Sequence, residues 1–293
     1  MKTLEALQRE LDTSTDLQSI VRTMKVLAAV SIRQYERAQE SLQEYTKNVE
    51  MGLQVVLQQH PAAPNKTKNT PPVLGAVIFG SDHGLCGRYN ESIAEFAINE
   101  LDKINSKQDS RRILVVGARV EASLHEMGQT VEDYFWVPGT VDNITCTVQK
   151  ILLKIDQWQQ DGVEQVMLFH HARQQRGNYP PQVRQLLPVD LSNFNHKQKK
   201  PWPSRSVPQF SLSAEKLLSS LNRQQLFIKL FNACAESSAG EHASRLMSMQ
   251  VAEKNIQERL ESLTASHRQQ RQGQITEELL DVVSGFEALQ DER

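Results

Sequence analysis

A ten-residue motif, residues 81–90, holds the side chains of this 293-residue chain that are best suited to chemistry. It reads Ser-Asp-His-Gly-Leu-Cys-Gly-Arg-Tyr-Asn and lies between an apolar run and a segment of helical pattern. Loops between a buried strand and a helix are where α/β folds place their sites. Cys86 is therefore a candidate nucleophile, with His83, His170 or His171 as its candidate base.

The surrounding residues favour a structural loop over a catalytic one. A nucleophile elbow has a glycine two residues to either side of the nucleophile; Gly84 fits, but Arg88 occupies the other position. The phosphate-binding patterns GxxxxGK[ST] and GxGxxG are both missing from the sequence. We therefore expect a tight turn in which Gly84 and Gly87 supply unusual φ values and a polar side chain ties down the loop. The residues of this structural loop are Ser81, Asp82, Gly84, Cys86 and Gly87.

No grouping of residues indicates a metal site, a cofactor or a disulfide framework. Cys86, Cys146 and Cys234 show no CxxC spacing and are odd in number, which favours a reducing compartment. His170 and His171 are neighbours in an expected strand, so they point to opposite faces and cannot easily share one metal ion.

Charge and hydropathy exclude several classes of protein. The net charge of −2 gives no reason to expect nucleic-acid binding, and we interpret the short basic patch at residues 196–205 as a solvated loop. No apolar run approaches the roughly 18–20 residues of a membrane span. The first five residues lack an apolar signal core, which disfavours secretion and organelle import.

Prolines divide the chain into three segments: 1–60, 61–210 and 211–293. Every proline lies between Pro61 and Pro208, and proline in a helix interior costs about 3 kcal/mol. The proline-free ends also carry apolar residues at steps of three and four, which predicts two long helices. In the first helix this stripe is Leu4, Leu7, Leu11, Leu17, Ile20, Met24, Leu27, Leu42, Tyr45, Val49, Leu53 and Val56. In the second helix the stripe closes with Leu279, Val282, Val283 and Phe286. Neither helix can bury its stripe alone, so we expect the two to wrap around each other as a coiled coil.

The middle segment alternates strand and helix patterns. Strands are expected at residues 73–79, 113–116 and 163–169, and helices at residues 91–104 and 143–158. Residues 61–72 read as a linker, and residues 185–188 and 209–212 are candidate edge strands. Such alternation predicts an α/β domain with a largely parallel sheet.

Four stretches of the chain resemble the gamma subunit of F-type ATP synthases. Residues 81–90 resemble its signature SDRGLCGxxN, and residues 240–249 resemble SEHAARMMAM. Residues 271–285 resemble RQAAITQELxEIVSG, and residues 20–29 more faintly resemble ITKAMKMVAA. The four matches occur in the family's order and span the chain.

This resemblance implies a fold and a function. The terminal helices would form an antiparallel coiled coil, with a Rossmann-like α/β domain in the middle. The chain would be the non-catalytic central-stalk rotor, turning inside a ring of alpha and beta subunits and contacting an epsilon-like subunit and the membrane rotor ring. It would be a peripheral membrane protein on the cytoplasmic side of a bacterial inner membrane.

The resemblance also implies particular partner contacts. The positions that match those facing the beta subunits in the family are Met24, Lys25, Arg245, Gln272, Thr276 and Glu278. Other positions depart from the family: His83 replaces the signature arginine, and Arg88 and Tyr89 replace a glycine and a leucine. These departures are typical of a divergent branch, for which the alternative sodium-translocating bacterial F-type ATPase is one candidate.

Two other functions fit parts of the pattern. One is a cysteine-dependent α/β hydrolase with helical arms, for which Cys86 would be essential. The other is a coiled-coil adaptor around a nucleotide-sensing α/β domain, which would bind nucleotide saturably.

Overall fold

The computed structural model describes residues 3–59, 73–104, 111–174, 177–189 and 209–291. The expected linker at residues 61–72 and the basic patch at residues 196–205 lie outside the described residues. The chain divides into two compact units, which we describe separately: Met1–Ala28 with Arg245–Arg293 (unit 1), and Ala29–Ser244 (unit 2).

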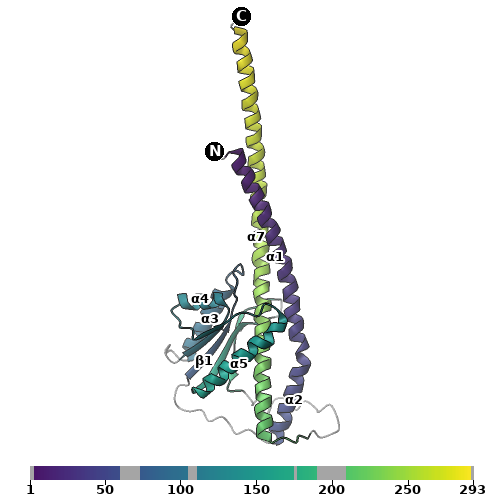
Figure 1. The fold of residues 1–293 in the computed structure, drawn as a ribbon, viewed down its shortest axis with the longest axis vertical. Helices are drawn as coiled ribbons and strands as arrows, with labels where there is room; N and C mark the ends of the chain where they lie inside the picture. The colour runs from purple at the N-terminus through teal and green to yellow at the C-terminus, as the bar shows by residue number, and fades with distance from the viewer. Residues whose placement is uncertain (1–2, 60–72, 105–110, 175–176, 190–208, 292–293) are drawn as a thin grey trace. The chain divides into compact units, whose positions relative to one another are not determined.

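The terminal helices are long (Figure 1). Helix α1 spans Leu4–Ser41 and α2 spans Gln43–Gln59, so the expected N-terminal helix has one break, at Leu42. Helix α7 runs without a break over Ala214–Asp291. Between them lie β1 (Val73–Phe79), α3 (Tyr89–Ile104), β2 (Arg111–Val116), α4 (Ala118–Glu126), β3 (Asp133–Phe135), the 3-10 turn η2 (Val141–Asn143), α5 (Ile144–Gln160), β4 (Val163–His171) and β5 (Pro181–Leu187).

The five strands of unit 2 form one sheet in the order β3-β2-β1-β4-β5. Strands β3, β2, β1 and β4 are parallel, and β5 is antiparallel to β4. The three predicted strands and both predicted helices are confirmed, and residues 185–187 belong to the edge strand β5. The expected strand at residues 209–212 is wrong, because this segment is a bend that leads directly into α7.

Two elements were not predicted from the sequence. Helix α4 buries only Val120, Ser123 and Leu124, too few for a recognisable stripe. Strand β3 is three residues long and pairs with β2 at Leu114, Val115 and Val116, so its own residues carry no strand pattern.

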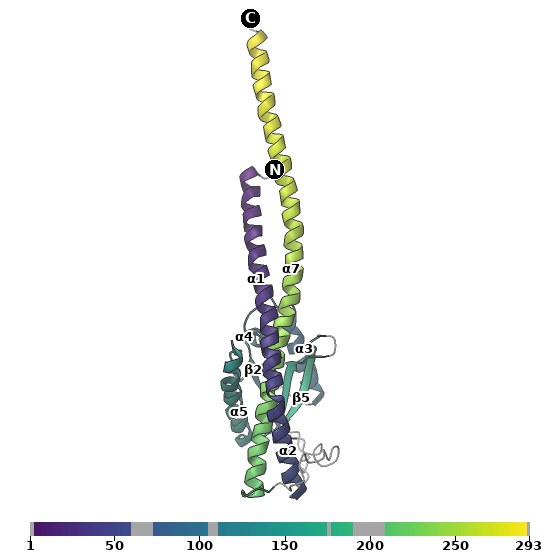
Figure 2. The same ribbon diagram turned by 90° about the vertical axis from the view of Figure 1, so that its right-hand side faces the viewer.

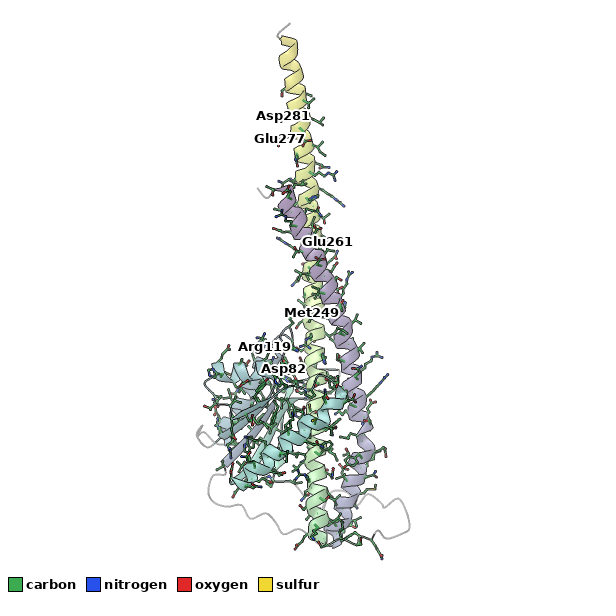
Figure 3. All side chains as sticks on the ribbon, viewed as in Figure 1. Asp82, Arg119, Met249, Glu261, Glu277 and Asp281 are labelled. Atoms are coloured by element: carbon green, nitrogen blue, oxygen red, sulfur yellow. The ribbon has the colours of Figure 1, made fainter. Side chains whose placement is uncertain are left out.

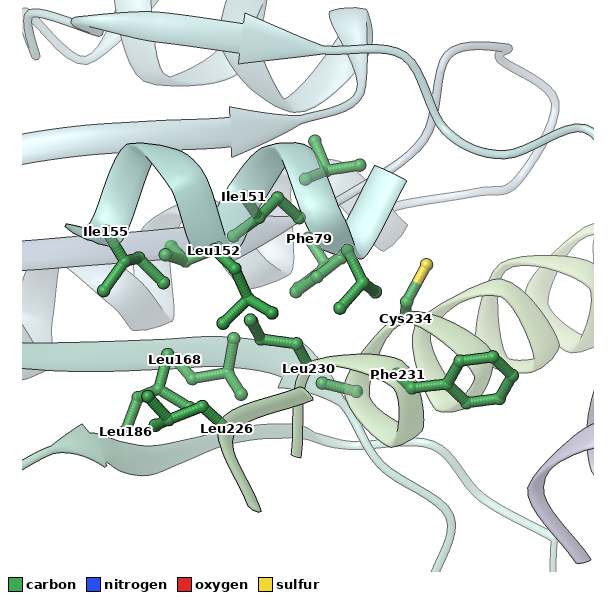
Figure 4. Packing of buried hydrophobic residues seen from close by; sticks show 14 of the residues in the cluster. Phe79, Ile151, Leu152, Ile155, Leu168, Leu186, Leu226, Leu230, Phe231 and Cys234 are labelled. Carbon is green, nitrogen blue, oxygen red and sulfur yellow. The ribbon is translucent and has the colours of Figure 1, made fainter. Parts of the chain in front are cut away.

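Helices cover both faces of the sheet because alternate strand residues point to opposite sides. Leu74, Ala76 and Ile78 of β1 join a cluster with residues of α3 and α4. Val77 and Phe79 join the other cluster, in which α5 and residues 226–239 of α7 cover the opposite face (Figure 4). Unit 2 is thus a three-layer α/β structure in which the C-terminal helix forms part of one layer.

In unit 2, α1 and α2 run antiparallel to α7. Gln39 Nε2 donates to Glu236 Oε1 at 2.7 Å, and Tyr45 lies further along, donating to Gln224. Further along still, a Cβ added at Gly52 would lie 3.1 Å from Leu221 Cδ2. As residue numbers rise on one helix they fall on the other, as Figure 2 shows.

Unit 1 is also an antiparallel helix pair. Arg259 donates to Glu10 at 3.4 Å, Gln18 donates to Gln257 at 2.8 Å, and Arg22 donates to Glu253 at 3.0 Å. The α1 residues that face α7 are buried or half-buried and alternate at steps of three and four, the spacing of a heptad seam. They are Leu4, Leu7, Leu11, Ser14, Gln18, Val21, Lys25 and Ala28.

This seam corrects the predicted stripe. Leu17, Ile20 and Leu27, which we expected to face α7, are exposed. The heptad that begins with Leu4, Leu7 and Leu11 next reaches Ser14 and Gln18. Leu17 lies one residue before Gln18, about 100° away around the helix.

The close contact between Gly75 and α5 gives a first prediction. A Cβ at Gly75 would lie 2.8 Å from Trp158 Cε3, and the buried indole ring has no room to move. Gly75→Ala should lower the free energy of unfolding by about 1–3 kcal/mol, measured by urea denaturation of the isolated chain. Gly139→Ala is the control, since nothing lies within 4 Å of its added methyl group. Equal stability of the two variants would contradict this packing.

Candidate partner-contact surface

Asp82 ties the loop after β1 to two other segments of unit 2. Its Oδ1 accepts the Ala118 N–H at 2.9 Å and its Oδ2 accepts the Val137 N–H at 2.8 Å. The first bond satisfies an otherwise unpaired amide at the start of α4, and the second holds the segment that follows β3. Asp82 and Arg119, at the start of α4, lie on the same side of unit 2 in Figure 3.

Ser81 and Asn90 close the same loop. Asn90 Oδ1 accepts the Ser81 N–H at 2.9 Å, and Asn90 Nδ2 donates to Ser81 Oγ at 2.8 Å. Ser244 Oγ of α7 donates to the Cys86 carbonyl at 2.6 Å. The loop is therefore held from both of its ends and from α7.

The backbone of the loop differs from our expectation at one position. Gly87 has φ 59°, as predicted, but Gly84 does not have a left-handed φ. Leu85 takes that conformation instead, with φ 64°, and its side chain is exposed. A leucine in this region is uncommon, so the tertiary bonds around the loop impose it.

The loop does not bring Cys86 together with a histidine base. The Cys86 thiol is buried beside Ser81 Oγ at 3.7 Å, Asn90 Nδ2 at 3.6 Å and the His83 backbone carbonyl at 3.7 Å. None of these groups is an imidazole. These contacts with a hydroxyl, an amide and a carbonyl are those of a thiol packed inside a structural loop.

His170 and His171 leave β4 toward opposite faces, as their adjacency predicts. His170 Nε2 lies 2.8 Å from Glu236 Oε2 of α7. His171 Nε2 lies 3.1 Å from Ser92 Oγ of α3, and its ring stacks on Tyr89 with centroids 4.1 Å apart. Among the described residues, no three His, Cys, Asp or Glu side chains gather closely enough to hold a metal ion. In the same part of the chain, no helix has the length and apolar character of a membrane span.

The six predicted partner contacts fall at separate levels of unit 1. Lys25 lies in the helix seam, where its Nζ and Arg22 Nε both donate to Glu253. These two hydrogen bonds hold the pKa of Glu253 below its usual value. Gln272, Thr276 and Glu278 are exposed and lie beyond position 270 on α7. At 1.5 Å per residue, Gln272 is about 28 Å along α7 from Glu253, so no single site unites them.

Besides Lys25, three of these residues are already engaged or covered. Thr276 Oγ1 donates to the Gln272 carbonyl one turn earlier at 2.9 Å. Arg245 is buried, and Met24 is half-buried. The freely accessible members are thus Gln272 and Glu278.

The C-terminal end of α7 is apolar but exposed, which differs from the prediction. We expected Leu279, Val282 and Val283 to close the coiled-coil stripe, but all three are exposed, as is Ile275. Gln18 faces Gln257, and the two helices run in opposite directions. Leu4, fourteen residues before Gln18, therefore lies level with residue 271, fourteen residues after Gln257. Helix α1 begins there, and the rest of α7 has no α1 residue to pack against.

Burial of His171 makes stability depend on pH. The pKa of His171 is lowered to about 3, because burial penalises the charged imidazolium and the neighbouring His170 repels it. In the unfolded chain a histidine has a pKa of about 6.5. The contribution of neutral His171 to the free energy of unfolding is therefore fully present above about pH 6.5. It is lost progressively as the pH falls toward 3.

His171→Gln should remove this pH dependence. Between pH 6.5 and 4.5 the unfolding free energy of the wild type should lose up to about 1.4 kcal/mol per pH unit through His171. The variant should lose correspondingly less, as measured by urea denaturation of the isolated chain at several pH values. His125→Gln, at an exposed position, is the control. An unchanged slope in His171→Gln would show that His171 is not the group that titrates.

Comparison with known proteins places the chain in a family. A family model described as ATP synthase matches residues 3–289. The ATP synthase gamma chain of Pelagibacter ubique is 25% identical, covering 99% of this chain and 100% of the relative. The gamma chain of Granulibacter bethesdensis is 27% identical over the same shares of the two chains.

Solved structures share the fold. A chain of the Euglena gracilis mitochondrial ATP synthase rotor has a TM-score of 0.63 at 14% identity, covering 93% of this chain and 98% of its own. A chain from the OSCP/F1/c-ring structure of the same enzyme has a TM-score of 0.65 at 14% identity, covering 98% and 94%. This chain therefore shares the fold of those two chains, with long terminal helices and a mixed sheet. Since the family model spans almost the whole chain, this protein belongs to the ATP synthase family, among its gamma chains.

Proposed function

We infer that this chain is the central-stalk rotor subunit of an F-type ATP synthase. By rotating, it couples ion movement through a membrane rotor ring to ATP synthesis or hydrolysis in a surrounding ring of alpha and beta subunits. The observation that carries this proposal is the exposed apolar end of α7. An enclosing partner would cover these side chains, and membership of the ATP synthase family supports the alpha/beta ring as that partner.

The end of α7 has the pattern of a helix that docks rather than one that is solvated. Ile275, Leu279 and Val282 follow at steps of four and three, which places them on one side of the helix. Leu279 and Val282 are 61% and 70% exposed. Burying an aliphatic side chain is worth about 1.5–3 kcal/mol. A sleeve, meaning a partner surface that encloses this end of α7, would therefore stabilise the complex by several kcal/mol. We assign that sleeve to the inner surface of the alpha/beta ring.

In this proposal, ATP synthesis or hydrolysis takes place in the alpha and beta subunits. We propose that the chain is a non-catalytic subunit; where the structure describes them, His170 lies against Glu236 and His171 against Ser92. We propose that Gln272, Thr276 and Glu278 contact the beta subunits. Lys25 could join them only by exchanging Glu253 for a carboxylate of the partner.

The remaining assignments follow from the same role. We propose that Met24 and Arg245 also lie at the beta-subunit contact, and that the central α/β segment, residues 61–210, contacts an epsilon-like subunit and the membrane rotor ring. The segments 1–60 and 211–293 would form the shaft. The complex would be attached to the cytoplasmic side of a bacterial inner membrane. Either protons or sodium ions fit this role, because the membrane ring selects the ion.

Co-purification tests the proposed function directly. The tagged chain, isolated from its native source, should bring down alpha-, beta- and epsilon-like subunits with ATPase activity. Recovery of the chain alone, soluble and monodisperse, would argue against a rotor.

Substitutions at the end of α7 test the observation behind the proposal. The double variant Leu279→Ser, Val282→Ser should leave the stability of the isolated chain unchanged, since both side chains are exposed. Its affinity for the alpha/beta ring should fall by at least about tenfold, because the apolar burial in the sleeve is lost. Glu277→Ser, an exposed polar position on the same turns, is the matched control. Wild-type affinity in the double variant would contradict the sleeve.

A further inference from the structure

The end of α7 continues the helix-pair seam of unit 1 beyond the point where α1 begins, as both Figure 1 and Figure 2 show. We call residues 272–291, which lie past the level of Leu4, the overhang. Gln257 faces Gln18 of α1, and Ile275 follows Gln257 by 18 residues, which is about five helical turns. Ile275 therefore lies on the side of α7 that faces α1 at the level of Gln257. The overhang presents one half of a seam that no described residue of α1 completes.

The exposed side chains of the overhang have the spacing of a coiled-coil seam. Ile275, Leu279 and Val282 follow at steps of four and three, and they are 48%, 61% and 70% exposed. Phe286 continues this spacing in the sequence by a further step of four. Scattered exposed aliphatic residues are ordinary, whereas a contiguous stripe marks a surface that a partner covers. The spacing indicates that this partner is another helix.

The stripe is complementary to a second copy of itself. If two overhangs lie antiparallel about a twofold axis between Leu279 and Val282, Leu279 of each copy lies opposite Val282 of the other. This is the contact of a twofold dimer, in which the same patch supplies both surfaces. In both layers a leucine then packs against a smaller valine, as a helix-pair core requires.

The position of α1 selects the orientation of the second copy. Helix α1 lies antiparallel to α7 on this same side, and it begins at the level of residue 271. A second α7 that ran parallel to the first would continue into the space that α1 occupies. An antiparallel α7 leads away from α1, and its C-terminal end meets the N-terminal end of α1. The negative end of one helix dipole then lies at the positive end of another, which is favourable.

We propose that the overhang pairs with the overhang of a second copy, as a short antiparallel coiled coil, when the chain is not assembled with other subunits. The proposal goes beyond the rotor function, because it concerns the unassembled chain. The second copy and the proposed alpha/beta ring would compete for Ile275, Leu279 and Val282, so assembly would release the dimer. The overlap of roughly 20 residues is about 30 Å long. Since this contact is short, the dimer depends on concentration.

The mass of the isolated chain in solution tests the proposal. Sedimentation should show the mass rising from 33.3 kDa to about twice that value as the chain concentration is raised. The double variant Leu279→Ser, Val282→Ser should raise the dissociation constant of the dimer at least about tenfold, because both layers lose apolar contact. Leu153→Ser, which removes a leucine of α5 that is 63% exposed, is the matched control and should dimerise like the wild type. At concentrations where the chain is monomeric, all three proteins should be equally stable.

Disulfide trapping tests the orientation. The variants are made in a Cys146→Ser background, because Cys146 is the exposed cysteine of the chain. Under mild oxidation, a mixture of Leu279→Cys chains and Val282→Cys chains should form a cross-linked dimer. Ile275→Cys alone should cross-link at least tenfold less, because an antiparallel pair separates the two copies of this position by about 16 Å along the helix axis.

The outcomes separate the dimer from the rotor function. A chain that stays monomeric at every concentration overturns the dimer and leaves the rotor function standing. A dimer that forms equally well in the double variant uses another surface, and efficient cross-linking of Ile275→Cys alone shows a parallel pair; either result overturns the proposal. If the chain dimerises as proposed but does not assemble with alpha and beta subunits, the rotor function fails and the dimer stands.

Discussion

The structure of unit 2 depends on one stretch of α7 that packs on two sides at once. None of residues 226–239 is exposed, because this stretch covers a face of the sheet and also meets α1. Leu230 and Ala233 belong to the same cluster as Phe79 and Leu168 of the sheet and Tyr35 of α1. Small side chains allow this approach: a Cβ at Gly240 would lie 3.1 Å from Tyr179. The α/β layer and the helix pair therefore share one core.

A buried polar group fixes the register of that contact. Glu236 accepts hydrogen bonds from Gln39 of α1 and His170 of β4, at 2.7 and 2.8 Å. Burial alone would favour the neutral acid, but these bonds and the nearby Arg184 hold the pKa of Glu236 below its usual value. A buried carboxylate needs such partners, so a shift of α7 by one turn would leave it unpaired. Apolar packing alone would tolerate such a shift more easily.

Unit 1, in contrast to unit 2, has only a small apolar core. Among the residues of unit 1 that the structure describes, the buried apolar ones are few, namely Leu7, Val21, Ala28, Met249 and Leu263. Polar pairs occupy several layers of its seam, and aliphatic side chains face water on both helices. A helix pair of this kind gains more from an enclosing partner than from its own interior. For the rotor subunit proposed above, this distribution leaves apolar surface exposed for contact with the proposed alpha/beta ring.

The sequence alone determined the elements with strong local signals. The absence of proline outside residues 61–208 permitted the long helices, and the continuous apolar runs at β1 and β4 predicted buried strands. The adjacency of His170 and His171 predicted their opposite faces. The family motifs, spread over the chain in order, predicted the fold class and the family. These features are local in sequence, so they need no knowledge of what packs against what.

Tertiary structure decided what local pattern left ambiguous. Helix α1 carries two stripes, and the heptad that starts at Leu4 forms the seam, in which Ser14, Gln18 and Lys25 alternate with apolar residues, leaving Leu17 and Ile20 outside. Leu85, rather than Gly84, took the left-handed backbone because bonds from Ser81, Asp82 and α7 hold the loop around it. The point at which α7 loses its partner depends on where α1 begins, at Leu4, across the pair. Each of these outcomes depends on residues that are far apart in the chain. The spacing of apolar residues within one segment does not indicate which distant residues that segment will pack against.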